Sequence, residues 1–239
     1  MRNIAVILAG GIGKRVGKNI PKQFIAVMGK PIIAYALSAF DNHPLIDEII
    51  VVVHKDYIGE TGNIVRREDF KKVCRIVPGG KERYESTYAA LEVYGKEECN
   101  LIIHDAARPF PTKSIIDSVI SLLKTHKAVN TAMDSTDSLI KIDSAHGTMR
   151  EILDRNTVMR VQTPQGFYAP LLKKAYETGM RNPDFKTTDD CSVVHKYLPE
   201  ETIAVVKGDP MNIKVTTPYD LLLVEFILSR NPVDFCGDN

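Results

Sequence analysis

The sequence predicts an α/β protein with a Rossmann-like, doubly wound and mostly parallel sheet. Apolar, β-branched runs of strand length recur along the chain, segments of helical period lie between most of them, and a glycine-rich turn follows the first run. Near-continuous apolar strands joined by helical crossovers form a sheet that is covered on both faces. Such sheets bind ligands beyond the carboxyl ends of their strands, so the loops there are the place to look for a site.

The expected elements alternate from the N-terminus onward. Strands are predicted at residues 3–8, 48–53, 101–104, 128–133 and 202–206. Helices are predicted at residues 31–41, 84–94 and 113–126, where apolar residues recur with helical spacing. A last helix is expected to begin at Pro218, with Thr217 as its N-cap.

The stretch at about 134–159 interrupts this alternation. Its segments TDSLIKID and GTMREILDRNTVMRV are typical of short ribbons with a polar face, joined by a turn at Ala145-His146-Gly147. We expect an arm that protrudes from a single domain of residues 1–239. An arm that cannot bury its own faces packs on something else, which favours a homodimer. A mobile loop is the alternative.

The composition bounds the class of protein. The 239 residues, 44% of them hydrophobic, allow one sizeable core. A net charge of +1 provides no global basic field for nucleic acid or an anionic membrane, and the apolar runs are shorter than the ~18 to 20 residues of a membrane helix. Because the four cysteines lack C-x-x-C spacing and the N-terminus lacks a signal-peptide pattern, we expect a soluble cytoplasmic protein with reduced thiols.

The most informative segment is VILAGGIGKRVGKNIPKQF at residues 6–24. Its glycines can turn tightly and bring bare N–H groups against phosphate oxygens. A dinucleotide fingerprint does not fit, because Val16 replaces the third glycine, and a P-loop does not fit, because Arg15 replaces the serine or threonine. The segment is therefore predicted to hold a triphosphate with its glycines and cations, namely Gly10, Gly11, Gly13, Lys14, Arg15 and Lys22.

Three further positions are candidates for the site. A second glycine turn, Gly79-Gly80, precedes Ser86 and could receive a base, although a plain strand-to-helix turn is the alternative. Asp105 ends an apolar run and is a candidate ribose or magnesium ligand, the alternative being an ion pair with Arg108. Lys214 lies between apolar neighbours near the end of a core strand, which would direct its ammonium into a site; an edge-strand charge is the alternative. His104 is expected to serve packing alone.

Five motifs in order resemble those of the cytidylyltransferases that activate polyol phosphates: VILAGG-x-G-x-R with PKQ, GG-x-ER, HDAARPF, R-x7-TPQ-x-F and NIK-x-TTP-x-DL. They cover the chain almost end to end. The resemblance implies that the chain transfers CMP from CTP to a polyol phosphate and releases pyrophosphate. It also implies Mg²⁺ as the cofactor and a homodimer as the active form.

The resemblance assigns roles to single residues. Arg15 and Lys22 match the pair that stabilises the pentacoordinate transition state at the α-phosphate. Arg155 and Lys214 match the residues that position the acceptor phosphate, with Arg155 reaching the neighbouring subunit's site from the arm. Asp105 matches the family residue near the ribose and the magnesium ion. Thr163 and Thr188 match positions at which family members place hydroxyl groups in the substrate site. The nucleotide-binding set is Leu8, Ala9, Gly10, Gly11, Gly80, Lys81, Arg83, Ser86, Asp105 and Ala106.

Two branches of this family share the motifs. Asp154-Arg155-Asn156 is similar to the branch that uses 2-C-methylerythritol 4-phosphate. That branch has P-A-A-G in the first loop and a lysine in a D-T-x-K segment, where this chain has Leu8-Ala9-Gly10-Gly11 and Ile140. Asp190-Cys191-Ser192, followed by Leu198-Pro199-Glu200-Glu201, is similar to capsule-type enzymes that use ribitol 5-phosphate. We expect ribitol 5-phosphate as the acceptor, with methylerythritol phosphate as the alternative, since pocket shape decides between them.

Two other classes of function compete with this one. A nicotinamide oxidoreductase would need the third glycine and an acidic residue after the second strand, where Val53-His54-Lys55 stands. A non-catalytic nucleotide-binding protein could keep the glycine turns, but it would not need Lys22, Arg155 and Lys214 together. The presence of all three favours an active enzyme.

Overall fold

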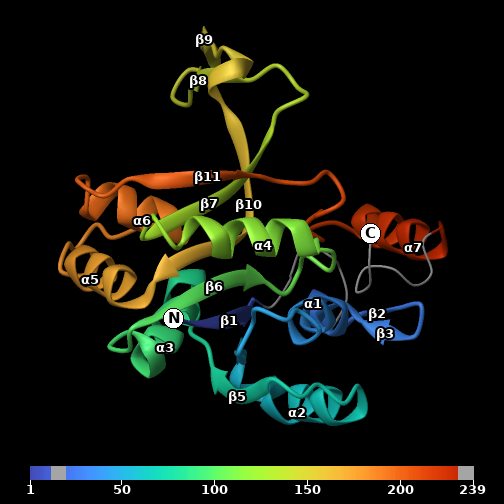
Figure 1. Cartoon of the computed structure of the whole chain (residues 1–239). Helices are drawn as coiled ribbons and strands as arrows, with labels where there is room; N and C mark the ends of the chain where they lie inside the picture. The colour runs from blue at the N-terminus through green and yellow to red at the C-terminus, as the bar shows by residue number, and fades with distance from the viewer. Residues whose placement is uncertain (12–19, 231–239) are drawn as a thin grey trace.

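The structure is a computed structural model that describes residues 1–11 and 20–230 of the chain (Figure 1). Its centre is a seven-stranded sheet in the order β11-β7-β10-β6-β1-β4-β5. β10 runs antiparallel to both of its neighbours, β6 and β7, and the other neighbouring strands pair in parallel. The strands are β1 (Arg2–Ala9), β4 (Glu48–Val53), β5 (Val73–Pro78), β6 (Cys99–Asp105), β7 (Ala128–Asp134), β10 (Met159–Tyr168) and β11 (Ile203–Lys207). The predicted α/β fold with a mostly parallel sheet is confirmed.

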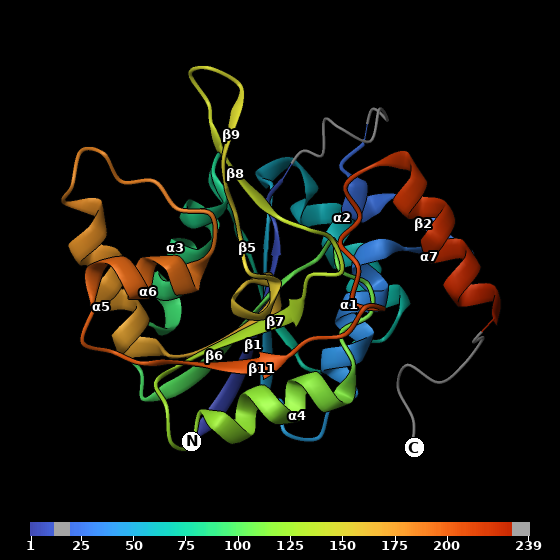
Figure 2. The ribbon, with the colours of Figure 1, turned by 90° about the horizontal axis from the view of Figure 1, so that it is seen from above.

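Helices cover both faces of the sheet, which explains the unbroken apolar strands. Alternate residues of β1 point to opposite faces, so Ile4, Val6 and Leu8 pack toward α3, α5 and α6. Ala5, Ile7 and Ala9 pack toward α1, α2 and α4 on the other face (Figure 2). The helices are α1 (Ile32–Asp41), α2 (Ile58–Arg67), α3 (Arg83–Tyr94), α4 (Lys113–Leu122), α5 (Ala169–Met180) and α6 (Asp190–Tyr197).

A smaller apolar cluster holds the last helix, α7 (Pro218–Arg230), against the hairpin of β2 (Ala26–Val27) and β3 (Lys30–Pro31). α7 begins at Pro218, as predicted. The capping differs from the expectation, because the Thr217 hydroxyl donates to the Asp220 carboxylate at 3.0 Å. Asp220 also accepts the backbone N–H groups of Thr216 and Thr217, both at 2.7 Å, so it is the carboxylate that satisfies the start of this helix.

The five strands and three helices predicted from the apolar pattern are all present, but α4 ends at Leu122 rather than at residue 126. The sequence analysis did not identify β5, β10, α2, α5 and α6. β5 is an edge strand with exposed residues, so it lacks a continuous apolar run. β10 contains buried polar residues and Pro164, which hide its strand character.

Among the described residues, none of the helices combines the length and apolar character that a membrane crossing requires.

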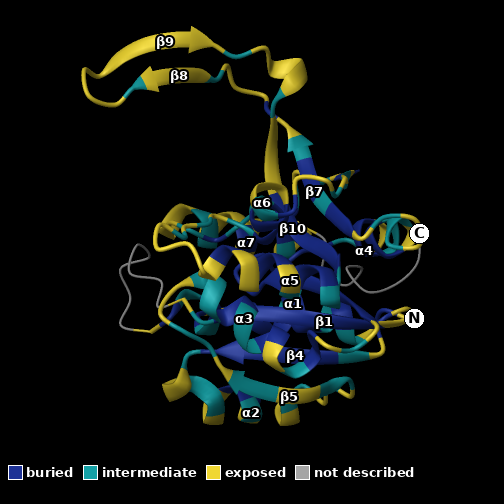
Figure 3. Ribbon diagram, turned by 90° about the vertical axis from the view of Figure 1, so that its left-hand side faces the viewer, coloured by how far each residue is buried: buried dark blue, intermediate teal, exposed yellow. Residues whose placement is uncertain are grey.

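The arm is a two-stranded hairpin of β8 (Ile140–Asp143) and β9 (Thr148–Ile152). It stands away from the body on the extended ends of β7 and β10 (Figures 1 and 3). Across the two strands Ile140 lies opposite Ile152, and Ile142 lies opposite Met149. We call these four residues the apolar arm face, and they are between 50% and 68% exposed (Ile140 50%, Ile142 55%, Met149 60%, Ile152 68%). The hairpin therefore has the predicted ribbon form, with an apolar face that nothing in the described chain covers.

Candidate active site

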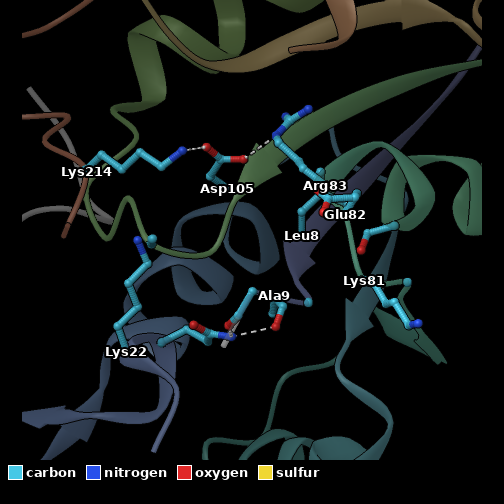
Figure 4. A pocket seen from close by; sticks show the side chains of 14 residues that line it. Leu8, Ala9, Lys22, Lys81, Glu82, Arg83, Asp105 and Lys214 are labelled. Carbon is cyan, nitrogen blue, oxygen red and sulfur yellow. Dashed lines mark hydrogen bonds and ion pairs between the residues drawn. The ribbon is translucent and has the colours of Figure 1, made fainter. Parts of the chain in front are cut away.

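A pocket of about 260 Å³ opens where β1 and β6 end at their carboxyl side (Figure 4). After β1 the chain adds β4 and β5 on one side of that strand, and it then crosses to place β6 on the other side. This change of direction is the topological switch point at which open α/β sheets bind ligands. The lining residues are Leu8, Ala9, Gly10, Gly11, Lys22, Gln23, Gly80, Lys81, Glu82, Arg83, Ser86, Asp105, Ala107 and Lys214.

The first glycine turn is held in place by a buried glutamine, Gln23. Gln23 lies in the short 3-10 helix Lys22–Phe24, and its Nε2 donates to the carbonyls of Ala9 at 2.5 Å and Gly11 at 2.8 Å. Gln23 belongs to the PKQ motif, but no role was predicted for it from the sequence. Its neighbour Lys22 lines the pocket and donates to the carbonyl of Val215 at 2.6 Å.

The second glycine turn joins β5 to α3 and packs against the first. A Cβ on Gly10 would lie 2.7 Å from Ser86 Oγ, and a Cβ on Gly79 would lie 2.6 Å from the same atom. Both glycines are therefore required by the close approach of Ser86. α3 begins with a reciprocal capping box, in which Glu85 accepts the backbone N–H of Glu82 at 2.8 Å. The structure thus brings together the two turns that the sequence analysis assigned to the nucleotide.

Asp105 lies at the end of β6 between two cations. Its Oδ2 accepts from Lys214 Nζ at 2.6 Å, and its Oδ1 accepts from Arg83 Nε at 3.1 Å (Figure 4). Burial alone would raise the pKa of Asp105, but Arg83 and Lys214 hold that pKa far below its usual range. Asp105 therefore stays ionised and anchors both cations. The alternative ion pair with Arg108 is absent from the described contacts, since Arg108 donates to the carbonyls of Asn212 and Val161.

A second buried carboxylate extends this chain of charges. Arg83 Nη1 donates to Asp190 Oδ2 at 2.8 Å, and the hydroxyl of Tyr176 donates to Asp190 Oδ1 at 2.6 Å. Asp190 is fully buried, and burial raises the pKa of Tyr176 well above its usual value. Arg83 is thus fixed between two anions. From the sequence, Asp190 was named in the segment Asp190-Cys191-Ser192 and was given no part in the site, because nothing local shows its partner.

Thr163 and Ala106 do not line the pocket. The Thr163 hydroxyl accepts the backbone N–H of Asp105 at 3.1 Å and contacts His104 Nδ1 at 3.1 Å, so it orients Asp105 from behind. Ala106 is fully buried in the core, and Ala107 takes the lining position. His104 packs against Phe40 and contacts the carbonyl of Arg108 at 2.9 Å, and burial lowers the pKa of His104 to about 4. The neutral ring therefore packs in the core, but it also contacts Thr163 and the carbonyl of Arg108, so the prediction of packing alone was incomplete.

Two other predicted residues lie away from this pocket. Arg155 begins the short 3-10 helix Arg155–Thr157 at the base of the hairpin, where it is exposed. Thr188 precedes α6, and its hydroxyl donates to Asp189 Oδ2 at 3.2 Å. Arg15, the other half of the predicted catalytic pair, lies outside the described residues together with Gly13 and Lys14.

The lining is suited to an anionic ligand. Lys22 and Lys214 extend toward the centre from one side, Arg83 enters from the other, and Lys81 points away from Asp105 (Figure 4). Within the described part of the lining there is no cysteine or histidine that could act as a nucleophile. Such a site promotes a reaction by holding and neutralising charge, so the attacking group must come from the substrate. Across residues 1–11 and 20–230 no cluster of three acidic, histidine or cysteine side chains could hold a metal ion.

Comparisons with known proteins agree with this geometry. Residues 3–230 match the family model described as 2-C-methyl-D-erythritol 4-phosphate cytidylyltransferase. A protein of that name from Thermobifida fusca is 38% identical, over 95% of this chain and 93% of its own length. A bifunctional ribulose 5-phosphate reductase/CDP-ribitol pyrophosphorylase from Haemophilus influenzae is 40% identical over 94% of this chain, which spans about half (48%) of that relative.

Among solved structures, the 4-diphosphocytidyl-2C-methyl-D-erythritol synthase of Anaerococcus prevotii superposes with a TM-score of 0.85. The two chains are 30% identical, and the match covers 96% of this chain and 99% of the other. The resemblance that the five motifs indicated is thereby confirmed at the level of sequence and of fold. The chain belongs to the 2-C-methyl-D-erythritol 4-phosphate cytidylyltransferase family and is a nucleotidyltransferase.

Proposed function

We propose that the protein transfers CMP from CTP to a polyol phosphate and releases pyrophosphate. The observation that carries this proposal is the pocket itself, in which Asp105 lies among two glycine turns and the cations Lys22, Arg83 and Lys214. A phosphate oxygen of the acceptor attacks the α-phosphorus of CTP, and the bond between that phosphorus and the oxygen bridging to the β-phosphate breaks. Because the nucleophile is already an anion, no general base is required.

In this proposal the cations act on charge that develops at the α-phosphate. Lys22, one of the proposed catalytic pair, is held beside the site by its bond to the carbonyl of Val215. Arg15 would complete the pair. The expected result for Lys22→Ala or Arg15→Ala is a kcat lower by roughly 100-fold or more, since each removes a donor that acts mainly in the transition state. Unchanged turnover in both variants would refute the assignment.

Lys214 is proposed to position the acceptor phosphate. Its ammonium lies 2.6 Å from Asp105 Oδ2, and its side chain retains 39% exposure, so it can reach a phosphate that enters the pocket. Asp105 in turn is proposed to contact the ribose of CTP. Substitution of Lys214 by alanine is expected to raise the KM of the acceptor more than the KM of CTP.

Magnesium is proposed as the cofactor, carried chiefly by the triphosphate. Asp105 is the expected protein ligand, but both of its oxygens are already engaged by cations. One carboxylate of this kind fits Mg²⁺, which commonly keeps waters and takes one or two carboxylates together with substrate phosphates. When bound, the ion neutralises charge on the phosphates. Removal of divalent ions with EDTA is expected to abolish pyrophosphate release, and full activity in its presence would refute the proposal.

A homodimer is proposed as the active form. Arg155 lies on the exposed arm rather than in the pocket of its own chain, and the apolar arm face offers a surface for a partner. Charges placed on this face by Ile140→Asp and Ile152→Asp together are expected to convert a dimer into monomers in sedimentation experiments. The same variant should raise the KM of the acceptor, as should Arg155→Ala alone. A fully active monomer would contradict this proposal.

Ribitol 5-phosphate is the proposed acceptor. The H. influenzae relative, whose name includes CDP-ribitol pyrophosphorylase, shares 40% identity over nearly the whole chain. Ile140 also stands where the methylerythritol branch is expected to have a lysine. Methylerythritol 4-phosphate is the second candidate, because the family model and the T. fusca relative carry its name.

The deciding experiment is pyrophosphate release with CTP and Mg²⁺, with the two acceptors compared in parallel. A kcat/KM at least tenfold higher for ribitol 5-phosphate would support the proposed acceptor. A preference for methylerythritol phosphate would replace it with the second candidate. Binding of CTP without turnover on either acceptor would favour a different polyol phosphate or a non-catalytic nucleotide-binding protein.

A further inference from the structure

The segment that carries Lys214 has no regular secondary structure, so the prediction of a core strand around this residue is wrong. The segment runs through residues 208–217, between the end of β11 and the start of α7. Its backbone bonds to the body include Gly208 N–H to the carbonyl of Ala132 at 2.7 Å and Val215 N–H to the carbonyl of Ala107 at 2.8 Å. Between these two points, side chains hold the segment in place. The position of the Lys214 ammonium therefore depends on those side chains.

Gln162 supplies the central contacts of this kind. It is 5% exposed, and its Oε1 accepts from the backbone N–H of Asp209 and from Asn212 Nδ2, both at 3.2 Å. Its Nε2 donates to the carbonyl of Asp209 at 2.9 Å and contacts Met133 Sδ at 3.1 Å. A Cβ on Gly208 would lie 2.5 Å from Gln162 Oε1, so the segment is fitted closely to this amide. Both ends of the Gln162 amide are thus used.

Asn212 completes the attachment from the other side. It is fully buried, and its Nδ2 also donates to the carbonyl of Thr163 at 2.8 Å. The backbone carbonyl of Asn212 accepts from Arg108 Nη1 at 2.7 Å. Lys214 lies two residues after Asn212, so the hydrogen bonds of Asp209 and Asn212 help to fix the position of the Lys214 backbone.

Gln162 also lies where the arm joins the body. It is paired with Thr131 across β10 and β7, and both strands continue from this level into the arm (Figure 3). Any displacement of the arm base therefore moves the Gln162 amide. We propose that Gln162 is a positioning residue that ties the Lys214 segment to the base of the arm. It acts through Asp209 and Asn212, and it places Lys214 for the acceptor phosphate. This inference rests on the proposed role of Lys214.

The test compares two substitutions of Gln162 with a matched control. Gln162→Leu removes both ends of the amide, and Gln162→Glu keeps the acceptor and removes the donor. Ser135→Ala removes a buried hydroxyl that donates to the carbonyl of Asp137 at the start of the arm, rather than to the segment of residues 208–217. We expect Gln162→Leu to raise the KM of the acceptor by roughly 10- to 100-fold, because small misplacements of a positioning group have effects of this size. The KM of CTP should change less than about twofold, and Ser135→Ala should change neither value by more than that.

Gln162→Glu adds a readout that general destabilisation would not produce. A carboxyl buried at this position has a raised pKa, and its protonated form can donate to the carbonyl of Asp209. The acceptor KM of this variant should therefore recover as the pH falls from about 8 to about 6, whereas the wild-type KM should not improve in the same way. An acceptor KM within twofold of wild type in Gln162→Leu would overturn the proposal.

Limited trypsin digestion separates this inference from the proposed function. Faster cleavage after Lys207 and Lys214 in folded Gln162→Leu than in wild type is expected, since the segment loses its attachment. Equal cleavage rates would overturn the attachment itself. If Lys214→Ala leaves the acceptor KM unchanged, the proposed role of Lys214 fails, while the digestion result still reports on Gln162.

Discussion

The substitution Asp190→Asn tests the buried charges that support the pocket. Asparagine keeps the shape of the side chain but removes the negative charge that faces Arg83 at 2.8 Å and the Tyr176 hydroxyl at 2.6 Å. Loss of one member of a buried ion pair costs about 3–5 kcal/mol when the remaining charge has no other partner. Arg83 retains Asp105 at 3.1 Å, so the full penalty does not apply.

The expected loss of stability in Asp190→Asn follows from the two hydrogen bonds that Asp190 accepts. Bonds to charged groups contribute about 1.5–3 kcal/mol each, and asparagine retains part of one of them, so the expected loss of stability is about 2–4 kcal/mol. For a chain of this size that corresponds to a fall in Tm of roughly 5–15 °C. Tyr176→Phe removes one of the same bonds and should cost about 1.5–3 kcal/mol.

Thermal and urea unfolding of the two single variants and the double variant provide the assay. Because the residues share one network, the double variant should be less destabilised than the sum of the two single variants. In parallel, the KM of CTP should rise in Asp190→Asn, since Arg83 loses one of the two anions that fix it. A Tm within 1 °C of wild type would refute the reasoning, because it would show that Asp190 carries no net interaction with Arg83 or Tyr176.

Two further predictions follow from the same region. Burial lowers the pKa of His104 to about 4, below its usual 6.5, so its contribution to stability is complete above pH 6.5 and is lost as the pH falls toward 4. The loss, about 3 kcal/mol by linkage, should appear as a falling urea midpoint between these pH values and should be much smaller in His104→Gln. Gly10→Ala should lower the Tm and raise the KM of CTP, because the new methyl group meets Ser86 Oγ at 2.7 Å. Ser86→Ala in the same chain should restore stability, and failure of this rescue would show that the clash lies elsewhere.

The parts of the fold that the sequence predicted are those in which one physical signal dominates. β1 and β4 are buried on both faces over residues 4–9 and 49–53, where every residue is apolar, and the run is visible without knowing its neighbours. The glycine turns were likewise visible because close approach tolerates no side chain. β10 was missed because it buries Gln162, Thr163 and Gln165. Their hydrogen bonds satisfy these polar groups in the folded chain, but in the sequence they read as a polar stretch.

The site could be predicted only as far as single residues reveal their own chemistry. Asp105 was identifiable because its carboxylate ends an apolar run, Lys22 because it follows the first glycine-rich segment, and Lys214 because it stands between the apolar residues Ile213 and Val215. Asp190 was not, because its partner Arg83 lies 107 residues away in the sequence and only the packing of α3 beside α5 and α6 joins them. Most of the lining was therefore predictable, with Gln23, Glu82 and Ala107 as the exceptions, and the second layer that supports it was not.

This second layer explains how a pocket rich in cations remains ordered before an anion enters it. Cations that face one another repel, and unpaired lysine and arginine side chains would adopt many rotamers. Asp105 and Asp190 alternate with Lys214 and Arg83, so each of these two cations is held by an anion at 2.6 to 3.1 Å. A triphosphate or an acceptor phosphate then meets charges that are already placed. Less reorganisation is needed at the moment of reaction, which is the condition under which fixed charges stabilise a transition state.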